Sequence, residues 1–214
     1  MTLTLTARDR FQQAYENRYT WDEQFPGYTA QVTWQAGEET LTAQVCIHRD
    51  LTVTIEGLPA DHPQYQELSG LMRDVVTHRQ RRDFATAHGQ NEFIAGEPLP
   101  DGAVSIQVKG DAMGSHYRVR GAVITQVSRV MGGRAFTIDT LSVEQTAQGY
   151  FPLHYRVQFT DAATGQPQQV VDIRETYEQV GGYYLLKERR QTVTKDGVTS
   201  EGVITFNDLK LLTE

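Results

Sequence analysis

The sequence predicts an α+β protein built mainly from antiparallel strands, and two patterns carry this prediction. From about Ala103 to Leu212, runs of alternating apolar and polar residues follow one another and are separated by short turns. Two earlier segments, residues 6–18 and 62–82, instead repeat apolar residues at helical spacing. A long antiparallel sheet coils, and its apolar face needs cover. We therefore expect one highly curved sheet of about eleven strands, a half-barrel or a barrel, with two helices packed in its concave side. A flattened sandwich is the alternative.

The first helix is expected over residues 6–18, because Thr6 can cap it with Asp9 three residues further on. Its apolar residues Phe11, Ala14 and Tyr15 recur at helical spacing. After this helix the alternation of apolar and polar residues predicts three strands joined by short hairpin connections, over residues 28–35, 40–48 and 51–56.

The second helix begins at Pro63, a residue that suits the first turn of a helix. Apolar residues then form one stripe between Tyr65 and Val76 at positions i, i+3, i+4 and i+7. The helix ends in the cations of His78–Arg82, which the helix dipole favours at a C-terminus. Residues 83–101 show the weakest pattern, with one strand expected near Phe93.

The remaining chain is expected to form a meander of strands over residues 104–108, 116–120, 122–130, 135–143, 152–160, 168–177, 183–194 and 198–206. Glycine pairs, Asp196-Gly197 and the loop 161–167 supply its turns, and residues 111–115 also suit a turn. In the strand 152–160, Leu153, Tyr155, Val157 and Phe159 share one face and polar residues share the other. The sheet is therefore expected to have a dry face and a wet face.

Composition limits the classes of protein that fit. At 214 residues, with 39% hydrophobic and 22% charged residues and no linker, we expect one soluble domain over residues 1–214. The net charge of −7 argues against general affinity for nucleic acid. Cys46 is alone, which excludes a disulfide framework and a thiolate cluster. No window is apolar enough for a membrane span or a secretory signal, so we expect a cytoplasmic protein.

The segment Phe11–Ala30, the basic run His78–Arg82, Asp111–Gly114 and Glu178–Leu186 together resemble a family of uncharacterised proteins. The resemblance covers nearly the whole chain and is most specific from Arg18 to Tyr28. It implies a host among cyanobacteria or photosynthetic eukaryotes, and a cytoplasmic position that includes the periphery of the thylakoid membrane. It implies no chemistry, because the family has no assigned activity.

The expected architecture also looks like that of the LolA/LolB-type lipoprotein carriers, which hold acyl chains between a sheet and helices. This likeness rests on architecture alone. The chain lacks the export signal of those carriers, so lipoprotein sorting itself is not expected.

Catalytic and metal-binding motifs are not found in the sequence. The six histidines are scattered, with no pair at the spacing that a metal site favours. No Gly-x-Ser-x-Gly motif is present, and Ser115 suits a turn better than a nucleophile. The pairs Gly132-Gly133 and Gly181-Gly182 join strands and do not open helices, which is not the pattern of a phosphate-binding loop. We expect no metal and no cofactor.

Three carboxylates on expected strands leave a catalytic role open, because a carboxylate in a dry cavity can act as a general acid. They are Asp139, Asp172 and Glu175. Arginines on neighbouring strands offer the simpler alternative, in which the carboxylates form structural or ligand-orienting ion pairs. An enzyme with a carboxylate in the barrel is the third of the functions considered.

The first function considered is that of a non-catalytic carrier or chaperone-like module for a hydrophobic small molecule such as a lipid, quinone, carotenoid or tetrapyrrole. Its ligand is expected between the sheet and the second helix, where pockets are mostly apolar. The residues expected to line it are Trp21, Trp34, Leu68, Leu71, Met72, Val75, Tyr155 and Tyr184.

The second is an assembly factor that docks on a photosynthetic or membrane complex without a ligand. Its expected docking surface, which also suits a lipid head group, is the basic run of an otherwise acidic protein. The residues of that surface are His78, Arg79, Arg81 and Arg82. Packing in the concave space separates the two functions, since a filled space leaves no room for cargo.

Overall fold

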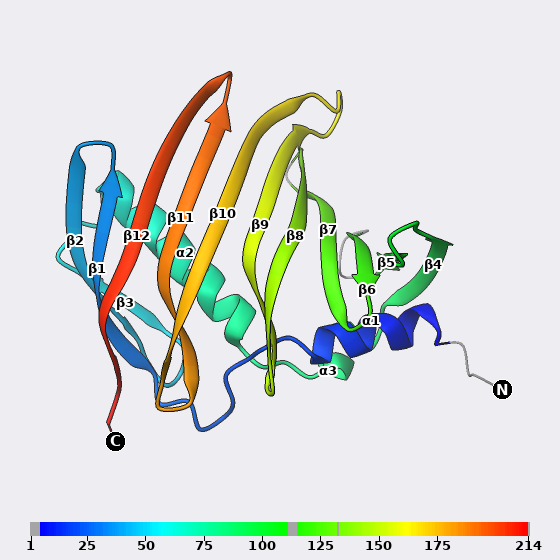
Figure 1. The fold of residues 1–214 in the computed structure, drawn as a ribbon, viewed down its shortest axis with the longest axis horizontal. Coiled ribbons are helices and arrows are strands. Elements are labelled where there is room, and N and C mark those ends of the chain that lie inside the picture. The colour runs from blue at the N-terminus through cyan, green and yellow to red at the C-terminus, as the bar shows by residue number, and fades with distance from the viewer. Residues whose placement is uncertain (1–4, 111–114, 132, 214) are drawn as a thin grey trace. The chain divides into compact units, whose positions relative to one another are not determined.

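The computed structural model describes residues 5–110, 115–131 and 133–213. Within them the chain forms three helices and twelve strands (Figure 1). The helices are α1 (Ala7–Glu16), α2 (Pro63–Arg79) and α3 (Phe84–His88). The strands are β1 (Tyr28–Ala36), β2 (Glu39–Ile47), β3 (Val53–Glu56), β4 (Glu92–Pro98), β5 (Val104–Lys109), β6 (Ser115–Arg120), β7 (Val123–Met131), β8 (Arg134–Thr146), β9 (Gly149–Asp161), β10 (Pro167–Val180), β11 (Tyr183–Lys195) and β12 (Val198–Leu211).

All twelve strands belong to one antiparallel sheet in the order β3-β2-β1-β12-β11-β10-β9-β8-β7-β6-β5-β4. Neighbours in the sheet are neighbours along the chain except where β1 pairs with β12. The sheet is open, because β3 and β4 are its two edges in the described residues. This confirms the predicted fold class, a mainly antiparallel curved sheet with helices. Of the two predicted forms, the sheet is an open half-barrel and not a closed barrel.

The chain divides into two compact units. Unit 1 comprises Met1–Tyr19, Arg82–Ile173 and Val193–Thr199, and unit 2 comprises Thr20–Arg81, Arg174–Thr192 and Ser200–Glu214. Strands β10, β11 and β12 contribute residues to both units. That the whole chain acts as a single domain stays a prediction.

In unit 1, helices α1 and α3 pack on one face of the strands. α1 begins with the expected capping box, in which the Thr6 hydroxyl accepts a bond from the Asp9 amide and the Asp9 carboxylate accepts one from the Thr6 amide. α1 contacts β4, β6 and β7. The buried core beneath it consists of Phe11, Ala14, Tyr15, Phe84, Ile106, Val108, Tyr117 and Val119.

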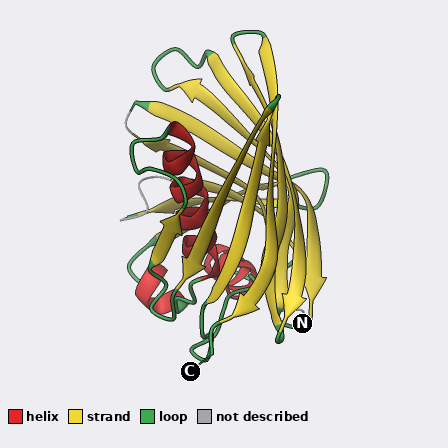
Figure 2. Ribbon diagram, turned by 90° about the vertical axis from the view of Figure 1, so that its left-hand side faces the viewer, coloured by secondary structure: helices red, strands yellow, loops and turns green. Residues whose placement is uncertain are grey.

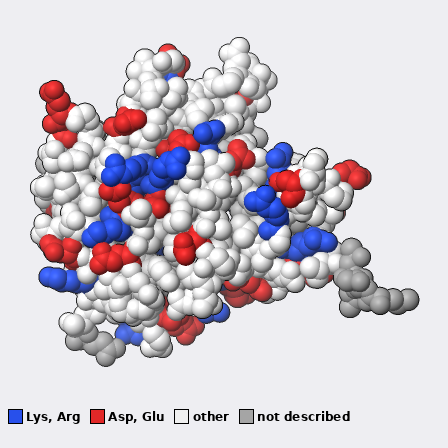
Figure 3. All heavy atoms as spheres, in the orientation of Figure 1, with Lys and Arg blue, Asp and Glu red and all other residues white. Residues whose placement is uncertain are grey.

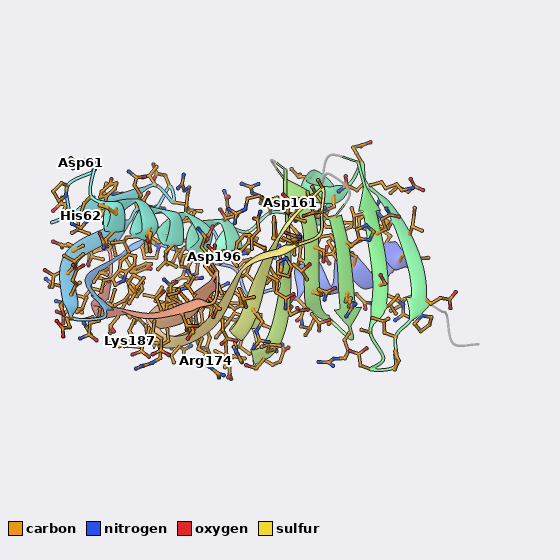
Figure 4. The ribbon with its side chains drawn as sticks, turned by 90° about the horizontal axis from the view of Figure 1, so that it is seen from above. Asp61, His62, Asp161, Arg174, Lys187 and Asp196 are labelled. Carbon is orange, nitrogen blue, oxygen red and sulfur yellow. The ribbon has the colours of Figure 1, made fainter. Side chains whose placement is uncertain are left out.

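In unit 2, α2 lies on one face of the strands (Figure 2). Its residues Leu68, Leu71 and Met72 are buried, as the helical spacing predicted. Strand β1 alternates buried and accessible residues, and Tyr28 and Val32 are among the fully buried ones. On the other face of the sheet, Arg174 and Lys187 point away from α2 (Figure 4).

Several details, mostly the bounds of strands, differ from the sequence prediction. α3 was not expected, because its five residues are too few to show a periodic pattern. Strand β12 continues to Leu211, beyond the predicted end at residue 206, because it pairs with β1 over that length. The turn expected at 111–115 falls mostly outside the described residues, and Ser115 begins β6.

Candidate functional site

The face of unit 1 that carries α1 is fully covered over β5 and β6 but only partly covered over β8 and β9. On β5 and β6, Ile106, Val108 and Tyr117 are at most 4% exposed. On β8 and β9, the corresponding apolar side chains are each half-buried. We call these five residues the apolar stripe: Phe136, Ile138, Tyr155, Val157 and Phe159.

Strand register places the apolar stripe on one face. Phe136 lies opposite Phe159, and Ile138 lies opposite Val157. The two phenylalanine rings are 6.3 Å apart between centroids. Val127 on β7, which packs against the buried core, lies opposite Ile138. The stripe therefore continues the dry face of the sheet beyond the strands that α1 contacts.

Two arginines border the apolar stripe. The Arg134 guanidinium lies over the Phe159 ring, with Cζ 4.7 Å from its centroid. Arg129, opposite Phe136 in the register, donates a 2.7 Å hydrogen bond to the Tyr117 hydroxyl. Cations beside an apolar surface suit a ligand that has an apolar body and a polar end.

The opposite face of the same strands is polar, as the alternation predicted. Asp172 accepts hydrogen bonds from Arg156 at 3.0 Å and pairs with His154 at 2.8 Å. Asp139 accepts a 2.6 Å bond from Gln126. Burial alone would raise the pKa of Asp172, but the hydrogen bonds and charges of His154 and Arg156 outweigh it and lower that pKa. Asp172 is therefore ionised and unsuited to act as a general acid near neutral pH.

The interior of unit 2 contains a buried charged network beneath α2. Arg79, in the last turn of α2, donates a 2.8 Å hydrogen bond to the Tyr177 hydroxyl. That hydroxyl donates to Glu175 at 2.6 Å, and the other Glu175 oxygen lies 3.4 Å from Arg189 Nε. Arg79, Glu175 and Arg189 are each less than 10% exposed. The network joins the end of α2 to β10 and β11, and it gives Glu175 the ion-pair role that was the alternative to catalysis.

An aromatic cluster lies next to this network. The Trp21 ring stacks on Phe25 at 4.0 Å and meets Tyr28 edge-on at 6.1 Å. The Trp21 amide donates a 2.7 Å hydrogen bond to the Arg79 carbonyl, which fixes Trp21 beside the end of α2. This cluster explains why the Trp21–Tyr28 segment has so many aromatic residues.

A pocket of about 540 Å³ opens at one end of unit 2, beside the turn between β2 and β3. The Asp50 carboxylate binds Thr52 of the same turn, which lowers the pKa of Asp50. Five of the pocket's seven lining residues have polar or charged side chains, and Pro26 and Leu212 add apolar surface. The lining residues are Pro26, His48, Arg49, Asp50, Thr52, Leu212 and Thr213.

The family model for proteins of unknown function DUF3386 matches residues 2–212. The chain belongs to the DUF3386 family. The predicted resemblance to a family without assigned activity is thereby confirmed, and its distribution among photosynthetic organisms stays a prediction. No curated protein matched the chain.

Several solved structures are similar to this DUF3386 protein over almost the whole chain. A putative outer membrane lipoprotein-sorting protein domain from Vibrio parahaemolyticus is 12% identical, with a TM-score of 0.37, 97% of this chain covered and 94% of that chain. A LolA superfamily protein from Nitrosomonas europaea is 9% identical, with a TM-score of 0.26 and coverage of 99% and 96%. A DUF1329 family protein from Desulfovibrio piger is also 9% identical, with a TM-score of 0.30 and coverage of 97% and 94%. At such scores these likenesses carry no functional argument.

The residues predicted to line a ligand site belong to both compact units. Trp21, Trp34, Leu68, Leu71 and Met72 are buried within unit 2. Val75 and Tyr184 are half-buried in the same unit. Tyr155 belongs to unit 1, where it is part of the apolar stripe. Their shared role in binding stays a prediction.

The predicted docking residues also differ from one another. His78, Arg81 and Arg82 are exposed, whereas Arg79 is only 6% exposed and binds Tyr177 in the interior. Arg79 therefore does not lie on the surface where the basic run was expected to dock. Other basic side chains gather over β10 to β12 (Figure 3), where Lys187 pairs with Glu178 at 3.0 Å.

No helix in the described residues is long and apolar enough to cross a membrane. In the same part of the chain, no group of three or more His, Cys, Asp or Glu side chains is placed to hold a metal ion. Cys46 is partly buried, and its Sγ lies 3.8 Å from His48 Nδ1. Burial raises the pKa of the Cys46 thiol, which disfavours the reactive thiolate.

Proposed function

We propose that this DUF3386 protein is a non-catalytic binding protein, a carrier or chaperone-like module, for a hydrophobic small molecule. The observation that carries the proposal is the apolar stripe on β8 and β9, whose side chains share one face and are only partly covered. The cargo class is that of a lipid, quinone, carotenoid or tetrapyrrole in a photosynthetic cell. The protein is cytoplasmic in this proposal, with the thylakoid surface as its point of delivery.

The half-burial of the apolar stripe favours a small molecule over a protein partner. A protein interface needs exposed side chains that a broad surface can cover. The five residues of the stripe are instead already partly covered, so a slender ligand is enough to cover what remains. Full burial of one such side chain contributes about 1.5–3 kcal/mol. A ligand that covers the part of the five side chains that is still exposed, about a third of each at most, therefore adds up to a few kcal/mol.

Substitution of Val157 by Asp tests the proposal, because it places a charge at the centre of the apolar stripe. We expect N-phenylnaphthylamine, a neutral apolar dye, to bind the native protein with enhanced fluorescence and to bind Val157→Asp at least tenfold more weakly. Gln158→Asp is the matched control, since it adds the same charge to the adjacent residue, which is exposed on the opposite face. Native mass spectrometry and solvent extraction would identify any cargo that is retained.

Circular dichroism would first show that both variants fold. Equal dye binding by Val157→Asp and by the native protein would contradict the assignment of the apolar stripe. Loss of binding in Gln158→Asp as well would mean that charge in general, and not the stripe, controls the affinity.

A second function, docking on a photosynthetic complex without a ligand, rests on the exposed cations at the end of α2. Arg81 and Arg82 are exposed and follow the helix directly. In this proposal, Arg81→Glu together with Arg82→Glu releases the protein from thylakoid membranes in a fractionation experiment. Unchanged fractionation would remove the support for docking.

A further inference from the structure

Two aromatic side chains of unit 2 carry a buried hydrogen-bond donor that has no acceptor among the described residues. The Tyr28 hydroxyl and the Trp21 indole N–H have no hydrogen-bond partner among the described residues. Tyr28 is fully buried and Trp21 is 3% exposed. A buried donor without a partner costs about 1–3 kcal/mol, so two on adjacent aromatic rings call for a physical reason.

Several charged side chains of unit 2 surround these two donors. Arg79 lies near both, because its carbonyl binds the Trp21 amide and its charge acts on the Tyr28 hydroxyl. Burial raises the pKa of Tyr28, with Arg79 opposing it, so the hydroxyl keeps its proton and can donate. The carboxylate of Glu175 is engaged by Tyr177 and Arg189. Asp74 on α2 is also subject to the charge of Arg189.

The missing partner of the Tyr28 hydroxyl and the Trp21 N–H must accept hydrogen bonds, and the charge of Arg79 favours an anion. A water molecule both donates and accepts, and a buried water usually makes about three hydrogen bonds. A carboxylate only accepts, so it matches the indole N–H, which only donates, and a hydroxyl that can donate beside it. We propose that Trp21 and Tyr28, with Arg79 beside them, form a buried site for the carboxylate of a small organic acid. The site belongs to unit 2 and the apolar stripe to unit 1, and the test of the site does not depend on the proposed function.

Both donors are closed off from solvent, so an acid can enter only when this end of α2 moves or while the chain folds. The experiment therefore refolds the full chain from urea in the presence of each probe. The probes are octanoate, octanol with the same tail and a neutral head, and acetate without a tail. The chain has two tryptophans, so Trp34→Phe leaves Trp21 as the sole tryptophan reporter.

We expect octanoate to change the Trp21 emission saturably in Trp34→Phe and to raise the Tm of the native chain. Tyr28→Phe, which removes only the hydroxyl, is expected to weaken octanoate binding roughly tenfold or more. Tyr117→Phe is the matched control, because it removes a buried hydroxyl that already binds Arg129 in unit 1. It is expected to lower Tm without changing the affinity for octanoate.

The other probes separate the outcomes. Acetate that binds as well as octanoate identifies a free carboxylate as the ligand, and octanoate alone identifies an acid with an apolar tail; both support the site. Octanol that binds equally well overturns it, because the carboxylate is then not recognised. The proposal is also overturned if octanoate does not bind. A higher Tm in Tyr28→Phe then shows that the Tyr28 hydroxyl was an unsatisfied donor, and a lower Tm shows that it bound a buried water. The native chain gives the Tm comparison even if Trp34→Phe fails to fold.

Discussion

His88 is an imidazole held among aromatic rings in the core of unit 1. Its ring centroid lies 5.1 Å from that of Phe11, 4.8 Å from Tyr15 and 5.6 Å from Phe84. Its Nδ1 is 3.0 Å from Asn91 Nδ2, which can donate to it only when Nδ1 carries no proton. Burial, with the charges of nearby arginines acting in the same direction, lowers the pKa of His88 from 6.5 to about 4. The folded protein therefore keeps this imidazole neutral.

The shift in pKa gives a pH dependence of stability with a definite sign. The unfolded chain protonates His88 below about pH 6.5, whereas the folded chain resists protonation down to about pH 4. The stability from neutral His88 is therefore fully present above about pH 6.5 and is lost as the pH falls toward 4. A shift from 6.5 to about 4 corresponds to an upper limit of about 3 kcal/mol. Because the imidazole is only half-buried, solvent screening reduces this to about 1–2 kcal/mol.

The perturbation that tests this is His88→Gln, which keeps an acceptor for Asn91 and removes the titrating group. Urea unfolding at about pH 7 and about pH 4.5 is expected to show that the native protein loses about 1–2 kcal/mol more than the variant. His116→Gln, at an exposed site, is the control and should follow the native protein. Parallel losses in the native protein and His88→Gln, or a His88 pKa near 6.5 by NMR titration, would refute the reasoning.

Three further predictions concern stability, each measured by urea unfolding. Thr6→Ala removes the cap of α1 and is expected to cost about 1 kcal/mol, and no change would mean that α1 is held by packing alone. Gly149→Ala is expected to lower the free energy of unfolding by more than about 2 kcal/mol, because its φ is +121° and a Cβ would lie 2.5 Å from a backbone oxygen. Gly121→Ala is the control and should lower it less, because its φ is +57° and a Cβ there meets open space. Glu175→Gln removes the buried carboxylate that faces Arg189, for a loss of about 3 kcal/mol, and a neutral effect would show that the ion pair is dispensable.

Much of the fold follows from local patterns in the sequence. The alternation of apolar and polar residues predicted the strands of the meander, because side chains on neighbouring positions of a strand point to opposite faces. The capping box of Thr6 and Asp9 was also predictable, since it depends on residues only three apart. α3 was missed because a helix of five residues is stabilised by tertiary contacts of Phe84 and not by a periodic pattern.

The candidate sites were less predictable, because they depend on which helix covers which strands. The alternation from Tyr155 to Phe159 in β9 resembles that in β5 and β6, yet the apolar residues of this part of β9 stay partly exposed. Ile106, Val108 and Tyr117 on β5 and β6 are instead buried. Helix α1 contacts β6 and β7, and no local sequence pattern predicts which strands the helix covers. Arg79 illustrates the same limit, since its three basic neighbours in the run His78–Arg82 suggest a surface, while its partner Tyr177 is 98 residues away in the sequence.

The position of the carboxylates favours binding over catalysis. A general acid near neutral pH needs a raised pKa, which comes from burial without compensating charge. Asp172 has the opposite environment, since His154 and Arg156 lower its pKa on the polar face of the sheet. Glu175 is buried, but Arg189 and the Tyr177 hydroxyl each engage one of its oxygens. These partners give the carboxylates a structural role. The partly covered apolar stripe can still bury surface against a ligand, and the Trp21 and Tyr28 donors of unit 2 can still form hydrogen bonds with one.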